Sequence, residues 1–111
     1  MKNVRIRTEV REKLLLIAEH DLKEATRVFV ILEHLEIKLA RTTDFWNIQD
    51  SASGNIESRA TLKDGTPIWR LCPTHVHCIA LLVMQDEDLL VLEVCNRAEI
   101  ETVERRLIDS N

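Results

Sequence analysis

The sequence predicts an α+β fold in which two helices cover one face of an antiparallel sheet. Three observations lead to this prediction. Apolar residues recur at helical spacing over two consecutive N-terminal segments, the second half reads as strands, and only two glycines and two prolines interrupt the 111 residues. Helices gathered ahead of consecutive strands, rather than alternating with them, indicate the α+β class. We expect a single domain over residues 1–111.

The N-terminal half is expected to form a strand and a helical hairpin. Val4 and Ile6 alternate with arginines, as in a short strand with one apolar face. A helix over residues 10–20 follows, and an Asp-x-x-Glu capping box at Asp21 begins a second helix over residues 21–40. The apolar stripe of this second helix comprises Leu22, Ala25, Val28, Phe29, Leu32, Leu35 and Leu39.

The C-terminal half is expected to form a meander of about three strands and a short helix. Residues 41–58 are polar and predict a loop, with Phe45 and Trp46 as its anchors. The strands are expected at residues 58–63 and 67–72, as a hairpin or one bent strand, and then at 75–84 and 89–96. Residues 98–108 have helical spacing, with acidic residues early and basic residues late, which suits the helix dipole.

The last two strands are predicted to form a hairpin with a three-residue loop, Asp86-Glu87-Asp88, which places His77 directly opposite Arg97. The face expected beneath the helices is then uniformly apolar: Val76, Cys78, Ala80, Leu82, Met84, Leu90, Leu92 and Val94. The other face carries His75, His77, Glu93, Arg97 and an apolar strip of Ile79, Leu81, Val83, Leu89 and Val91. Such a strip needs a cover, either the C-terminal helix or a partner protein.

Composition narrows the functional classes. Hydrophobic residues make up 45% and charged residues 31%, ordinary proportions for a globular protein. The N-terminus lacks a secretion signal and no apolar run approaches the roughly 20 residues of a membrane helix, so we expect a cytoplasmic protein. The three cysteines are expected to be free thiols. With a net charge of −4, any nucleic-acid contact must depend on local clusters of basic residues.

The segment IWRLCPTHVHCIALLVMQDEDLLVLEVCNRAEI resembles the second half of proteins of the RelE/ParE toxin superfamily. The shared features are an aromatic-Arg-Leu strand, a strand opening on a basic residue, an acidic turn, and an apolar strand ending in a polar residue, an arginine and an acid-rich helix. The resemblance implies a toxin of a toxin–antitoxin pair, a RelE-like ribosome-dependent mRNA endoribonuclease that needs no metal or other cofactor. It also implies a cognate antitoxin, which we expect on Ile79, Leu81 and Val91.

By position in this resemblance, Arg70, His77 and Arg97 are the expected catalytic residues. The two arginines would hold phosphate through paired hydrogen bonds, and the histidine would transfer protons near neutral pH. The expected RNA-contacting residues are Lys63, His75 and Arg59. The chain departs from the family pattern in having no tyrosine, in its acidic charge, and in Ile68 and Cys72 where a basic residue is common.

Two alternatives use the same residues differently. The first is a non-catalytic binding module on the same fold, either a ParE-like inhibitor of DNA gyrase or an inactive toxin relative that binds a protein partner. The second is a zinc site formed by His75, His77 and Cys72, for which the sequence supplies no fourth ligand at a suitable spacing.

Overall fold

The structure, a computed structural model, describes residues 3–41, 54–73 and 77–110. Its elements follow in the order β1 (Val4–Ile6), α1 (Thr8–His20), α2 (Leu22–Arg41), β2 (Gly54–Thr61), β3 (Pro67–Pro73), β4 (Ile79–Gln85), β5 (Asp88–Cys95) and α3 (Ile100–Ser110). The predicted α+β class is therefore confirmed, whereas the arrangement of the strands differs in part from the prediction. The predicted anchors Phe45 and Trp46 lie outside the described residues.

Within the described residues, the strands form one five-stranded sheet in the order β1-β5-β4-β3-β2. Strands β2 to β5 are an antiparallel meander, and β1 adds to its edge parallel to β5. The meander thus has four strands rather than about three. Strand β2 begins at Gly54, four residues earlier than expected. Its pairing with β3 extends to Pro73, so that Gly54 and Asn55 also belong to the strand.

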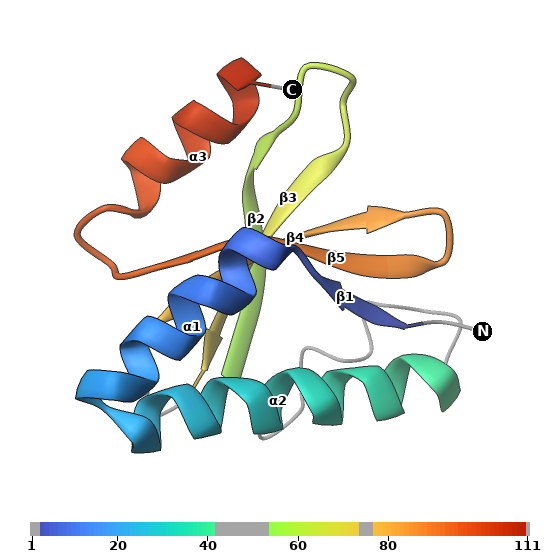
Figure 1. Cartoon of the computed structure of the whole chain (residues 1–111). Helices are drawn as coiled ribbons and strands as arrows, with labels where there is room; N and C mark the ends of the chain where they lie inside the picture. The colour runs from blue at the N-terminus through green and yellow to red at the C-terminus, as the bar shows by residue number, and fades with distance from the viewer. Residues whose placement is uncertain (1–2, 42–53, 74–76, 111) are drawn as a thin grey trace.

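Helices α1 and α2 cover one face of the sheet, as predicted (Figure 1). The Asp21 carboxylate accepts a hydrogen bond from the Glu24 backbone N–H at 3.0 Å, which confirms the N-cap of α2. Leu22, however, is 67% exposed, because the first turn of α2 projects it into solvent instead of onto the sheet. The buried stripe of α2 consists of Ala25, Val28, Leu32 and Leu35, with Phe29 half-buried beside it.

Helix α3 covers the opposite face, so the sheet has an apolar core on each side (Figure 1). Ile100, Val103 and Leu107 are the buried residues through which α3 packs on Ile79 and Leu81. The spacing of the three places them on one side of the helix. Ile79, Leu81 and Val83 of the predicted strip are therefore covered by the chain's own last helix in this structure.

The β4–β5 hairpin is tighter than predicted. Its turn contains two residues, Asp86 and Glu87, because β5 already begins at Asp88, which pairs with Gln85. Asp86 has a positive φ of 58°, the left-handed backbone that a two-residue hairpin turn requires at its first position.

A β-bulge between Leu81 and Leu82 separates two registers in this hairpin. At the open end of the hairpin, from the pair Ile79–Cys95 to the pair Leu81–Glu93, the register is the predicted one. Between the bulge and the turn, the register is shifted by one residue. A shift of one residue turns each side chain to the opposite face. The predicted faces are therefore wrong near the turn: Leu89 and Val91 lie beneath α1 and α2, and Leu90 and Leu92 lie on the α3 side.

Candidate functional site

A buried ion pair joins the sheet to α3. Strand β3 places Arg70 on the face that α3 covers, where its guanidinium Nη2 donates a hydrogen bond to Oε1 of Glu104. Arg70 is 8% exposed and Glu104 is 4% exposed. The hydrogen bond to Glu104 raises the pKa of Arg70 and outweighs the effect of burial, so Arg70 is a permanent cation and not a proton donor.

This pair is incompletely satisfied. The Nε atom of Arg70 and the Oε2 atom of Glu104 are buried and have no hydrogen-bond partner among the described residues. A buried donor or acceptor without a partner costs about 1–3 kcal/mol, so few such atoms occur in folded proteins. The ion pair therefore contains one hydrogen-bond donor, Nε of Arg70, and one acceptor, Oε2 of Glu104, that are both without a partner in the described part of the chain.

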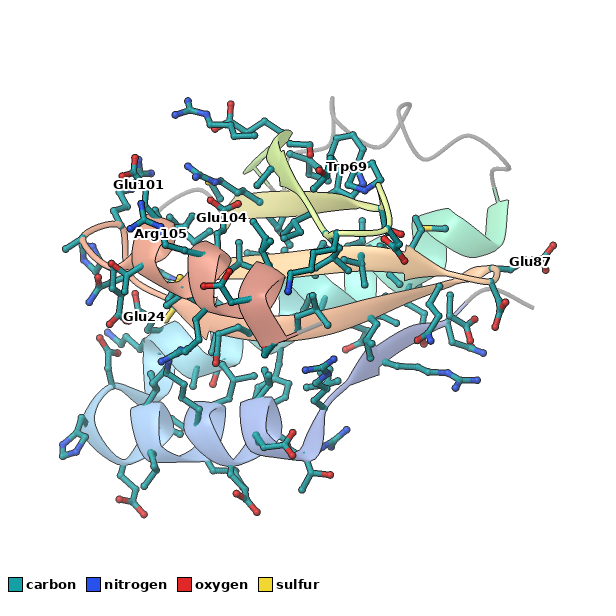
Figure 2. The ribbon with its side chains drawn as sticks, turned by 90° about the horizontal axis from the view of Figure 1, so that it is seen from above. Glu24, Trp69, Glu87, Glu101, Glu104 and Arg105 are labelled. Carbon is teal, nitrogen blue, oxygen red and sulfur yellow. The ribbon has the colours of Figure 1, made fainter. Side chains whose placement is uncertain are left out.

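The pair borders an open depression between α3 and the β2–β3 hairpin. Its charged lining consists of Arg59, Arg70, Glu101, Glu104 and Arg105, and Ala60 and Ile108 complete it. Figure 2 shows that Glu101, Glu104 and Arg105 lie on the side of α3 that faces these strands. The lining contains three arginines and two glutamates, and Arg59 also forms an ion pair with Glu57 at 3.1 Å.

Arg97 is brought to the same region by the turn before α3. In this turn the Asn96 side chain accepts from the Glu99 N–H at 3.1 Å, and the Glu99 side chain accepts from the Asn96 N–H at 3.2 Å. This reciprocal capping box fixes the backbone around Arg97, whose side chain is exposed. Burial raises the pKa of the Cys72 thiol, and the positive charges of Arg97, Arg70 and Arg59 oppose that rise. The positive charges of these three predicted site residues thus all influence the pKa of Cys72 in β3.

His77 is placed differently from the prediction. The β4–β5 ladder ends at the pair Ile79–Cys95, so His77 and Arg97 lie beyond the last paired residues at the same end of the hairpin. The His77 side chain is exposed, and its backbone N–H donates to Oε1 of Glu24 on α2 at 2.5 Å. His77 is thereby tied to the helix layer on the opposite side of the sheet from Glu104. His75 lies outside the described residues.

Lys63 contacts the C-terminal end of α3. It lies in the β2–β3 turn, and its Nζ donates to the backbone carbonyl of Asp109 at 3.3 Å, near the C-terminus of the helix. A cation there stabilises the helix dipole. Arg97 precedes the N-terminus of this 11-residue helix, and at 1.5 Å per residue the helix is about 16 Å long. Lys63 and Arg97 therefore lie at opposite ends of α3, and the contact of Lys63 with RNA stays a prediction.

Glu93 and the cysteines are placed by their contacts. Glu93 lies 3.6 Å from Lys13 and 3.7 Å from Arg106 and links α1 to α3. Cys72, Cys78 and Cys95 are free thiols. Among residues 3–41, 54–73 and 77–110, no group of three or more histidine, cysteine, aspartate or glutamate side chains is arranged to hold a metal ion.

Glu104 is the site residue that sequence reasoning missed. It follows Val103 and occupies, together with Ile100 and Leu107, the stripe of α3 that faces the sheet. A carboxylate within an apolar helical stripe is the signal that indicates a buried partner of opposite charge. None of the described helices combines the length and the apolar character that crossing a membrane requires.

Comparison with known proteins finds no matching family model, no matching curated protein and no matching solved structure.

Proposed function

We propose that the protein is the toxin of a toxin–antitoxin pair and cleaves messenger RNA on the ribosome in the manner of RelE-like proteins. The observation that supports this proposal is the gathering of Arg59, Arg70 and Arg97 beside α3, in a chain whose net charge is −4. Guanidinium groups bind phosphate oxygens through paired, charge-assisted hydrogen bonds. A local concentration of arginines is what RNA contact requires of an acidic protein.

The proposed reaction needs no cofactor. The 2′-hydroxyl loses its proton to a base as its oxygen attacks the adjacent phosphorus. The bond from phosphorus to the 5′ oxygen breaks, and a 2′,3′-cyclic phosphate remains. The exposed Arg59 and Arg97 bind the RNA backbone, and Arg70 stabilises the negative charge that develops on the phosphate oxygens. The departing 5′ oxygen receives a proton from His77, which is exposed at the same hairpin end as Arg97, or from water.

Expression without an antitoxin tests this proposal. Wild type is expected to slow growth and to produce new mRNA ends within ribosome-bound messages, and Arg97→Ala is expected to lose both effects. The matched control is Arg106→Ala, which removes the same charge from an exposed position whose described contact is with Glu93. Wild type that leaves both growth and mRNA unchanged would refute the nuclease proposal, as would equal loss of activity in the two variants.

A non-catalytic binding module is the second candidate, and the burial of Arg70 against Glu104 favours it, because that pair already neutralises the central arginine. Growth arrest with intact mRNA and inhibited DNA supercoiling would select a ParE-like gyrase inhibitor. Growth inhibition that requires neither RNA cleavage nor gyrase would select a protein-binding relative.

The antitoxin partner remains part of the proposal, but its predicted contact surface changes. Ile79 and Leu81 lie beneath α3, and Val91 lies beneath α1 and α2, so these residues are buried in the free protein. An antitoxin would have to contact other surfaces or displace α3. Hydrogen exchange of α3 amides with and without the product of a neighbouring reading frame distinguishes the two cases.

A further inference from the structure

We propose that Arg70 and Glu104 together recognise a ribonucleotide, and that Glu104 accepts the proton of its 2′-hydroxyl. This inference rests on the proposed function and assigns the general base to a residue that the resemblance does not indicate. The two atoms without partners carry the argument, namely a donor on Arg70 and an acceptor on Glu104.

The chemistry of these two atoms defines the ligand that satisfies both. Nε of Arg70 needs an acceptor, and Oε2 of Glu104 needs a donor. Because Arg70 and Glu104 are hydrogen-bonded to each other, one molecule that carries an acceptor next to a donor can satisfy both atoms at once. A ribonucleotide offers a phosphate oxygen as acceptor and the adjacent 2′-hydroxyl as donor. A deoxyribonucleotide offers the phosphate alone, so the contact selects RNA over DNA.

The surroundings provide a route to the pair. The side chains of Arg70 and Glu104 are 10% and 5% exposed and border the open depression. The long side chain of Arg59 at its rim is 63% exposed, and Arg105 is exposed as well. RNA phosphates meet these two arginines first, and movement of their side chains admits the sugar–phosphate unit to the covered atoms.

The position of Glu104 suits a general base better than that of His77. Glu104 is held by Arg70, the residue that binds the phosphate, so one contact aligns base and electrophile. As the 2′ oxygen bonds to phosphorus, Oε2 takes its proton. The bond from phosphorus to the 5′ oxygen breaks, and that oxygen receives a proton from water. Glu104 then returns its proton to solvent. The His77 backbone is fixed to α2 on the other side of the sheet.

The test uses ribosomes programmed with one short mRNA in two forms, which differ only by ribose or 2′-deoxyribose in the decoding-site codon. Retention of wild-type protein on the ribosomes is measured by sedimentation. Loss of one hydrogen bond predicts about tenfold weaker retention on the deoxyribose form. Glu104→Gln keeps the shape but cannot accept a proton, so it should bind the ribose form and fail to cleave it. The control Glu87→Gln, in the exposed β4–β5 turn, should cleave normally.

The outcomes separate the two proposals. Equal retention of wild type on both forms overturns the inference and leaves the nuclease proposal intact if the ribose form is cut. Cleavage by Glu104→Gln at the wild-type rate also overturns it. Absence of cleavage by wild type on the ribose form refutes the proposed function and this inference with it. The wild-type comparison of the two mRNAs decides the sugar preference even where a variant fails to fold.

Discussion

Replacing Glu104 with alanine is expected to be among the most destabilising single changes in the described part of the chain. Arg70 is 8% exposed, and the substitution leaves its guanidinium without the carboxylate that balances its charge. Removing one partner of a buried ion pair costs about 3–5 kcal/mol, because an unpaired charge stays buried. Typical domains have a total stability of about 5–15 kcal/mol, so the loss is a large fraction of it.

Replacing both partners gives the opposite result. In the double variant Arg70→Met, Glu104→Leu, apolar side chains of similar size fill the space between β3 and α3 and leave no buried charge. Such replacements are commonly neutral or stabilising by about 1–4 kcal/mol. A double variant as stable as wild type, or more so, but without activity would indicate that the pair serves function at the expense of stability.

Urea unfolding followed by tryptophan fluorescence measures these changes, because Trp69 is buried in the core beneath α1 and α2. The matched control is Glu101→Ala, an exposed glutamate on the same helix, which should change the free energy of unfolding by less than about 0.5 kcal/mol. A loss below about 1 kcal/mol in Glu104→Ala, with an unchanged m-value, would contradict the described burial of the pair.

Two further predictions concern the buried thiols and the N-cap of α2. Burial raises the pKa of Cys78 and Cys95 from 9.0 to about 11, with Glu24 adding to the rise at Cys78 and Glu99 at Cys95. The thiols of the unfolded chain ionise at lower pH than those of the folded protein. The free energy of unfolding is therefore unaffected below pH 9.0 and falls as the pH rises toward about 11. An unchanged urea midpoint across this pH range would contradict this prediction. Asp21→Ala removes the N-cap of α2 and should cost about 1 kcal/mol in urea unfolding, whereas Asp21→Asn should cost much less; equal losses would contradict the capping role.

Elements with a local cause could be predicted from the sequence. The strand at Val4 and Ile6 follows from alternation of apolar and charged residues, and the start of α2 follows from the side chain of Asp21. The pairing of β1 with β5 could not be predicted, because it joins residues 85 positions apart and no local pattern specifies that neighbour. The exposed Leu22 shows the same limit, since periodicity places a residue on a helical face but does not determine where the covered surface ends.

The candidate site likewise contains residues that could be predicted from the sequence and residues that could not. The resemblance indicated Arg70 and Arg97, and the structure gathers both near Cys72. The predicted register between His77 and Arg97 was correct only beyond the bulge, because one additional residue in β5 reverses the faces without any glycine to mark the position. Glu104 lies 34 residues from Arg70, so their pairing appears only once α3 is packed on the sheet.

The central claim is tested most directly by the chemistry of the cut ends. Purified protein is added to ribosomes translating a defined mRNA, and the 3′ ends of the fragments are characterised. The account predicts fragments with 2′,3′-cyclic phosphate ends in the decoding-site codon, formed without divalent-metal dependence in the cleavage step and absent with Arg97→Ala. Intact mRNA, or fragments ending in a 3′-hydroxyl, would contradict it.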